Sequence, residues 1–201
     1  MSGYMKIERI NGEYDYMIIA VIIICIISSF ILPFIFVYLI QESIFNSASN
    51  WIFFSPLSAY FTFMLGMLWI PVPLAVHLII KNKTSRSSSL LTGILIIFIS
   101  GPLFFSSINN YVFIDQQGIH YNDLFKKSPT EFSWDKIQNV HEVFQKKNGN
   151  NILIEYDFVT DSNKVIKLPS TKVSVLNKSL IYQQLEKHGV EVDNNLKDLY
   201  E

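Results

Sequence analysis

Residues 17–40 read MIIAVIIICIISSFILPFIFVYLI, and these 24 positions contain no charged side chain. At about 1.5 Å per residue, a helix of this length extends roughly 36 Å and exceeds the hydrocarbon layer of a bilayer, which is about 30 Å thick. The apolar run is also much longer than the core of a cleaved signal peptide. The stretch therefore predicts an uncleaved transmembrane helix, and the rest of the chain has to be interpreted relative to a membrane.

The charged residues divide the chain near residue 109. Of the 33 charged side chains, nine precede residue 110 and 24 follow it. This predicts a polar tail at residues 1–16, a membrane part at residues 17–108 and a water-exposed domain after it. The formal net charge of −1 gives no sign of a nucleic-acid partner. The only cysteine is Cys25, so an intrachain disulfide is excluded.

Two further apolar stretches, at residues 57–80 and 90–108, predict a second and a third transmembrane helix. Pro71 and Pro73 are expected to kink or end the regular hydrogen bonding of the second helix. The third stretch has only 19 residues, so a re-entrant segment is the alternative to a full span. His77 has no acidic or second histidine partner in any span, which disfavours a proton-relay role.

Small residues recur at helical spacing within these two stretches. Small side chains on one face allow a second helix to approach closely. The predicted helix-packing positions are Ser58, Thr62 and Gly66 in the second stretch, and Gly93 and Gly101 in the third.

The distribution of Lys and Arg predicts the orientation of the chain in the membrane. The N-terminal tail holds two such residues, the first loop holds none, and residues 81–89 hold three. The positive-inside rule then places the N-terminus and residues 81–89 in the cytoplasm and the first loop outside. If the third stretch spans, the C-terminal domain lies outside as well.

From residue 111 onward the hydrophobic pattern changes to strict alternation, which is typical of strands. Asn148-Gly149 is a strong signal for a two-residue hairpin turn. Beyond this turn, Ile152, Ile154, Tyr156 and Phe158 are expected to share one face of a strand. In all, six strands are predicted, at residues 111–115, 119–121, 130–134, 137–145, 152–158 and 164–168.

A helical pattern follows Pro169, with Gly189 placed to cap the helix. Its expected apolar stripe consists of Val173, Leu176, Leu180, Ile181 and Leu185. Residues 190–201 are expected to form a polar, frayed tail. The predicted fold class is therefore α+β: three transmembrane helices, followed by a small antiparallel β-barrel or sandwich that is closed by one C-terminal helix.

The order of several motifs resembles the bacterial pleckstrin-homology-like (PH-like) domains of small membrane proteins from Gram-positive bacteria. These motifs are YVFIDQQGIHY (111–121), FSWDKIQNV (132–140), the Asn-Gly hairpin, VIKLP (165–169) and the closing helix. The resemblance covers residues 109–189 and implies a binding or scaffolding module. It also implies a seventh strand, for which Asn109 or residues 124–127 are the candidates. The turn at residues 116–118 carries no cation, unlike the phosphoinositide-binding members.

Side chains that carry chemistry are sparse. Lys126, Lys127, Lys146 and Lys147 are candidates for contact with anionic lipid, although acidic neighbours cancel much of their field and favour plain solvated turns. No catalytic motif such as GxSxG is present, and no cofactor is predicted. The spacing of His120, His141, Asp115 and Asp135 is not that of metal ligands, so no metal site is predicted.

The sequence thus predicts a non-enzymatic multipass protein of the cell membrane. It would present its PH-like module at the bilayer surface to a protein or peptide partner, and a homo-oligomer is compatible with the sequence. One alternative is an immunity or envelope-stress protein that acts against membrane-active peptides. Another is an accessory subunit of a transporter, although spans without ionisable residues argue against autonomous transport.

Overall fold

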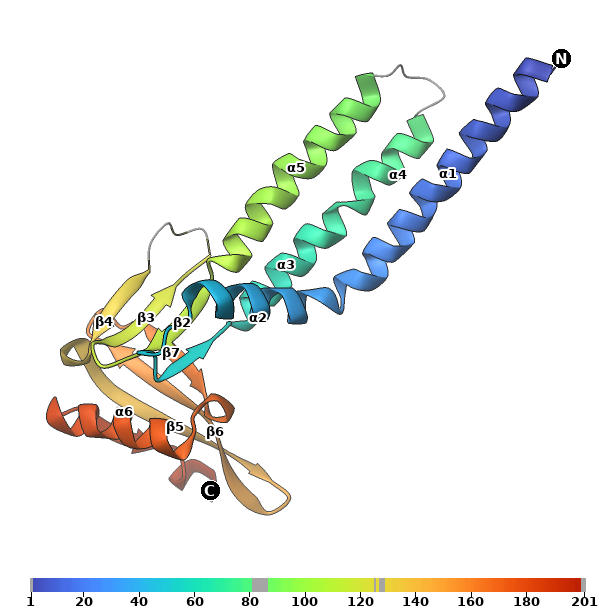
Figure 1. The fold of residues 1–201 in the computed structure, drawn as a ribbon. Helices are drawn as coiled ribbons and strands as arrows, with labels where there is room; N and C mark the ends of the chain where they lie inside the picture. The colour runs from blue at the N-terminus through green and yellow to red at the C-terminus, as the bar shows by residue number, and fades with distance from the viewer. Residues whose placement is uncertain (1, 81–86, 125, 127–128, 200–201) are drawn as a thin grey trace. The chain divides into compact units, whose positions relative to one another are not determined.

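The computed structural model describes residues 2–80, 87–124, 126 and 129–199 (Figure 1). The chain divides into two compact units. The helical unit comprises Met1–Ile44, Ser55–Asn110 and Leu124–Lys127, and the sheet unit comprises Phe45–Phe54, Tyr111–Asp123 and Ser128–Glu201. The fold is therefore α+β, with N-terminal helices, two four-stranded sheets that do not close, and a C-terminal helix.

The helical unit is built from apolar helices. Two of the described helices, Leu57–Ile79 and Leu91–Ile108, are long and apolar enough to cross a membrane. The bent pair Glu13–Ser29 and Leu32–Phe45 makes a third if it is counted as one span. The helices are α1 (Ser2–Ser29), α2 (Leu32–Phe45), α3 (Leu57–Trp69), α4 (Pro71–Ile80) and α5 (Ser87–Ile108).

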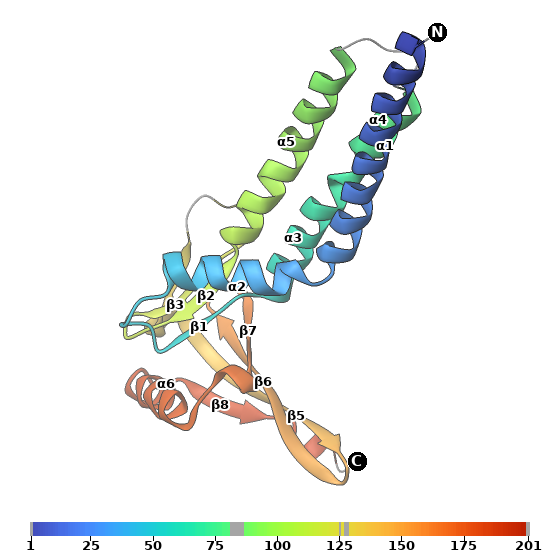
Figure 2. The same ribbon diagram turned by 45° about the vertical axis from the view of Figure 1, so that its right-hand side comes forward.

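The first apolar run does not form the single straight helix that the sequence predicts. Its axis bends by 66° between α1 and α2, and Figure 2 shows α2 turned away from the direction of α1. Pro33 has no N–H to donate to the carbonyl of Ser29, four residues earlier, which interrupts the helical hydrogen bonding at the bend. The hydroxyl of Ser29 donates to the carbonyl of Ile26 at 2.6 Å. In addition, α1 begins at Ser2, so most of the expected polar tail is helical.

The second and third apolar stretches are helical throughout most of their length. Regular helix is interrupted at Ile70, directly before Pro71, where the prolines predict a break. The third helix, α5, runs for 22 residues without interruption although it contains Pro102. Its length exceeds the 19-residue apolar stretch, because the helix continues into the serines that precede it.

Each sheet of the sheet unit contains four strands. The first is antiparallel, in the order β1-β2-β3-β4: β1 (Ile52–Phe54), β2 (Tyr111–Ile114), β3 (Gly118–Asn122) and β4 (Thr130–Ser133). The second has the order β7-β6-β5-β8: β5 (Ile137–Lys147), β6 (Asn150–Thr160), β7 (Val165–Pro169) and β8 (Glu191–Asn194), with β8 parallel to β5. Helix α6 (Val175–Lys187) lies between β7 and β8 in the chain.

Two of the eight strands were not predicted. Strand β1 comes from the loop between α2 and α3, and β8 comes from the expected frayed tail. Asn109 and the described residues 124 and 126 do not belong to a strand, whereas residues 125 and 127 of that candidate segment lie outside the described residues. The barrel alternative was wrong, because both sheets keep their edge strands unjoined.

The core of the sheet unit departs from the predicted faces in two places. On α6, Ile181 and Leu185 are buried, but Leu176 is 70% exposed. On β6, the register shifts opposite Val143 and Phe144, so the alternation that buries Tyr156 and Phe158 stops there. Ile152 and Ile154 beyond it are 45% and 39% exposed.

Candidate functional site

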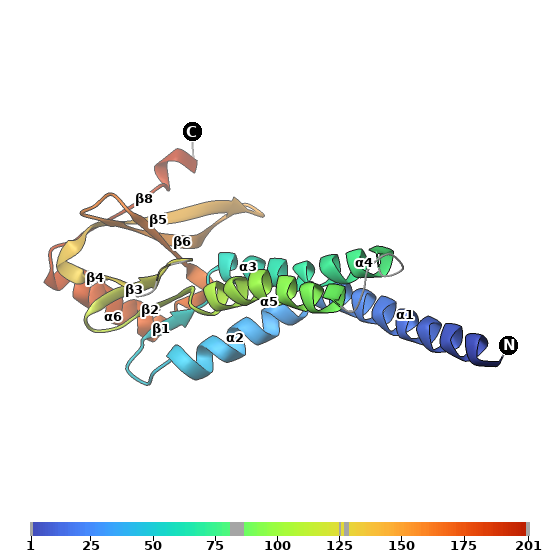
Figure 3. The ribbon, with the colours of Figure 1, turned by 90° about the horizontal axis from the view of Figure 1, so that it is seen from above.

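The small residues of the second apolar stretch lie where α3 meets α5, and Figures 1 and 3 show these helices side by side. A Cβ atom on Gly66 would lie 2.7 Å from the ring of Phe104, so only glycine fits this contact. The hydroxyl of Ser100 donates to the carbonyl of Gly66 at 3.0 Å. Thr62 is buried, and Ser58 accepts a hydrogen bond from the Asn110 amide at 2.6 Å.

The two glycines of the third stretch lie elsewhere. A Cβ atom on Gly93 or Gly101 would meet no described atom within 4 Å. Within the described residues these positions therefore do not form a close helix contact. The helix-packing positions of the two stretches are not brought together.

Gln41 has a role that the sequence did not indicate. Its side chain is fully buried, and its amide nitrogen lies 3.0, 3.0 and 2.9 Å from the carbonyl oxygens of Ser107, Ile108 and Asn110. Carbonyls at the end of a helix lack partners within the helix. Gln41 therefore caps the end of α5 from α2, although in the sequence it only marks the end of the first apolar run.

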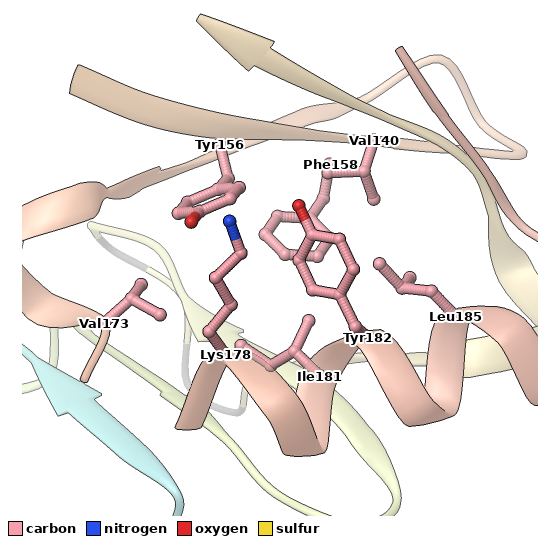
Figure 4. A pocket seen from close by; sticks show the side chains of 8 residues that line it. All are labelled: Val140, Tyr156, Phe158, Val173, Lys178, Ile181, Tyr182 and Leu185. Atoms are coloured by element: carbon pink, nitrogen blue, oxygen red, sulfur yellow. The ribbon is translucent and has the colours of Figure 1, made fainter. Parts of the chain in front are cut away.

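A cleft lies in the sheet unit between α6 and the second sheet, and Figure 4 shows its side chains. Sheet and helix residues line it together: Val140, Tyr156, Phe158, Val173, Lys178, Ile181, Tyr182 and Leu185. Its side chains leave no room for a water-sized molecule, whereas typical ligand sites have roughly 300–1,000 Å³. The cleft is therefore a packing feature in this conformation rather than a ligand pocket.

Polar groups hold α6 at one end of this cleft. The Tyr182 hydroxyl donates a short hydrogen bond to Glu142, and Lys178 Nζ lies 3.3 Å from the same carboxylate oxygen. Lys178 also lies 4.9 Å from the Tyr182 ring centroid and 5.5 Å from that of Tyr156. These contacts explain why the inward face of α6 includes a lysine, which a purely apolar pattern cannot indicate.

The electrostatic environment of this cluster favours a protonated tyrosine and a charged lysine. Burial, followed by the hydrogen bond and the charge of Glu142, raises the pKa of Tyr182 well above its usual value. Burial alone would lower the pKa of Lys178, but its interactions with Tyr156 and Glu142 outweigh this and raise it. Near neutral pH, Tyr182 therefore remains a hydrogen-bond donor and Lys178 remains a cation in this cluster.

The histidines and aspartates considered as metal ligands separate into pairs. His120 Nε2 lies 3.1 Å from Asp115, and its ring stacks on Phe113 at 4.2 Å between centroids. His141 hydrogen-bonds Asp193 across β5 and β8. Asp135 is exposed in another turn. No group of three or more potential ligands occurs within the part of the chain that the structure describes.

The candidate lipid-contact lysines belong to two segments of the chain. Lys146 and Lys147 are exposed at the end of β5, next to a turn in which Asn148 and Gly149 have φ of 53° and 82°. Lys126 is exposed in the segment between β3 and β4. The prediction for Lys127 lies outside the described residues. Lys126 belongs to the helical unit, whereas Lys146 and Lys147 belong to the sheet unit.

No protein-family model matches the chain, and comparisons with curated proteins and with solved structures give no match.

Proposed function

We propose that this chain is a non-enzymatic multipass membrane protein that holds a PH-like module at the membrane surface, where the module binds a protein or peptide partner. The observation that carries the proposal is the pairing of β1 with β2. One strand of the module, β1, comes from the loop between the helices α2 and α3. The chain therefore passes from the membrane anchor into the module and back before it reaches the C-terminal part.

The pairing of β1 is extensive for a three-residue strand. Ile52, Phe53 and Phe54 pair with Ile114, Phe113 and Val112. The backbone N–H of Trp51 also donates to the carbonyl of Ile114 at 2.8 Å. Ile52 and Phe54 are buried in the core of the sheet unit, so the loop is an integral part of the module.

This pairing restricts the membrane topology. In the proposed topology β1 and β2 lie on the same side of the membrane, because they are paired in one sheet. The chain between them contains the second and third apolar stretches, so either both of these cross or neither does. The positive-inside rule favours two crossings. In the proposed topology the second and third apolar stretches therefore both cross, and the module lies outside the cytoplasm.

Cysteine labelling in intact cells tests this topology. In a Cys25→Ala background, we expect Ser49→Cys and Ser162→Cys to react equally with a membrane-impermeant maleimide, and Ser85→Cys to react only after permeabilisation. Different labelling of positions 49 and 162 would contradict the shared sheet. If Ser49→Cys and Ser162→Cys were both protected in intact cells while Ser85→Cys was labelled, the orientation would be the opposite of the proposed one.

The unpaired edge of β7 supports binding of an extended segment. Within the described residues β7 pairs only with β6, which leaves one side of its backbone for a further strand. Val165 and Lys167 alternate with the buried Ile166 and Leu168 and are exposed. Val165 is therefore available to a partner, while Lys167 Nζ lies 2.8 Å from Glu155 on β6. The membrane anchor confines the module to a surface and thereby raises its effective concentration for partners there.

Site-specific photo-crosslinking in native membranes tests this binding mode. A photoreactive residue in place of Lys167 is expected to give an adduct with a second protein. The matched control carries the same residue in place of Gln183, which is exposed on α6. Identical adducts from both positions, or adducts that contain only this chain, would count against a partner at β7.

A further inference from the structure

An open hollow lies at one end of the first sheet, away from the α6 cleft. Strand pairing creates it, because β1 and β2 run antiparallel and bring the loop before β1 next to the turn after β2. The residues that line it are Ala48, Ser49, Trp51, Asp115, Gln116 and Gln117. All six belong to the sheet unit, and the β7 edge described above contributes none of them.

The hollow has a rigid wall on one side. Trp51 is partly exposed, and its ring lies 6.2 Å from that of the buried Trp134. The indole N–H of Trp134 donates to the backbone carbonyl of Asp115 at 3.3 Å. These contacts hold Trp51 and the start of the turn in place, so an aromatic side chain that lines the hollow is positioned before a ligand arrives.

Hydrogen bonds to one oxygen hold the Asp115 carboxylate in place. Its Oδ1 atom accepts hydrogen bonds from the backbone N–H groups of Gln117 and Gly118, at 2.8 and 3.2 Å, and lies 3.1 Å from His120 Nε2. No described residue donates to Oδ2. One oxygen thus orients the group, and the other remains an acceptor for a ligand.

The remaining polar groups of the hollow are neutral. Gln116 and Gln117 are exposed, and within the described residues their side-chain amides have no hydrogen-bond partner. Each amide offers two donor hydrogens and one acceptor oxygen. The Ser49 hydroxyl also lines the hollow, although it already shares a hydrogen bond of 2.8 Å with the Ser47 hydroxyl. The two amides therefore supply most of the donors and acceptors of a site that has a single formal charge.

We infer that this hollow binds a neutral polyhydroxylated ligand, the sugar rings of a glycan. A pyranose ring has an apolar C–H face that fits the Trp51 ring and hydroxyl groups that fit the amides and Asp115 Oδ2. A cationic group fits less well, because the only carboxylate already lies beside His120. The inference goes beyond the proposed function, because it adds a glycan ligand to the protein or peptide partner at β7, and it rests on the proposed position of the module outside the cell.

Binding is tested with the full chain in phospholipid nanodiscs, so that no sugar-headed detergent competes. The probes are a glucose tetramer and an N-acetylglucosamine tetramer at millimolar concentration, measured by saturation-transfer NMR and tryptophan fluorescence. We expect at least one tetramer to bind. Loss of two neutral hydrogen bonds in Gln116→Ala/Gln117→Ala is expected to weaken that binding by about tenfold.

The matched control is Gln183→Ala, an exposed glutamine on α6 that should leave binding unchanged. Absence of binding to the unmodified chain, equal binding by Gln116→Ala/Gln117→Ala, or binding of tetralysine instead of either sugar would overturn the inference. The assay does not depend on membrane orientation or on the β7 edge. Its failure is therefore distinguishable from a failed labelling or crosslinking experiment.

Discussion

The contact between α3 and α5 and the contact between α6 and the second sheet are packed with different residues. Small residues and hydroxyl groups form the first, and large apolar side chains form the second. In the first, glycine lets a ring approach to van der Waals distance, and the hydroxyls of Ser100 and Ser107 donate to carbonyls of α3. In the second, Phe158 and Leu185 are almost fully buried. Polar contacts there join side chain to side chain.

The two contacts differ in residue type because one unit is suited to lipid and the other to water. Lipid is as apolar as leucine, so helices that meet in a membrane gain mainly from close packing and hydrogen bonds. Water drives large apolar side chains together in proportion to the area that they bury. Residue size at a helix contact therefore indicates the environment in which that contact forms.

The largest expected change in stability comes from a substitution in the sheet unit. Phe158→Ala would leave a cavity beneath α6 and lower the free energy of unfolding of the sheet unit by about 3–5 kcal/mol. Urea unfolding in nanodiscs, in a Trp69→Phe background, would follow this unit through the fluorescence of Trp51 and Trp134. Ile152→Ala is the matched control, with an expected loss of under about 1 kcal/mol because Ile152 is 45% exposed.

An intermediate effect is expected on the membrane side. Gly66→Ala would place a methyl group against the Phe104 ring and destabilise the α3–α5 contact by about 1–3 kcal/mol. Gly93→Ala adds the same methyl group where no described atom lies within 4 Å, so it should be neutral or stabilising by up to about 1 kcal/mol. Unfolding in mixed SDS micelles, followed by circular dichroism, measures both; equal losses would mean that close packing at Gly66 does not matter.

The smallest expected effect is electrostatic. Burial, and then the charge of Glu155, raise the pKa of Asp157, while Lys167 and His141 partly offset this. A raised folded pKa means that the contribution of Asp157 to stability is greatest below its unfolded pKa of about 3.9 and is lost as pH rises through the folded value.

Asp157→Asn should therefore be the more stable protein at neutral pH, by less than about 1 kcal/mol because the side chain is partly solvated. The advantage should disappear below about pH 4, where Asp157 is protonated in both states. Urea midpoints of the two proteins measured across this range provide the test. A wild-type protein that is more stable at pH 7 would show that the ion pair with Lys167 dominates instead.

Much of the architecture was predictable from local patterns. The apolar stretches, the break before Pro71 and the Asn148-Gly149 hairpin all follow from neighbouring residues. The inward face of α6 was not predictable, because Lys178 and Tyr182 turn inward only where Glu142 on another element receives them. The extent of the β6 core face depended on a register shift with β5, which alternation within β6 does not reveal.

The sequence by itself determined that a charge-poor, helical N-terminal half precedes a charged, largely β C-terminal half, because hydropathy and its period are properties of contiguous residues. Only the tertiary structure decided that residues 52–54 belong to the C-terminal module and that Gln41 caps α5. Both depend on backbone groups about 60 to 70 positions away in the chain. The backbone groups at a strand edge or a helix end need hydrogen-bond partners. The sequence around them does not indicate which distant segment supplies those partners.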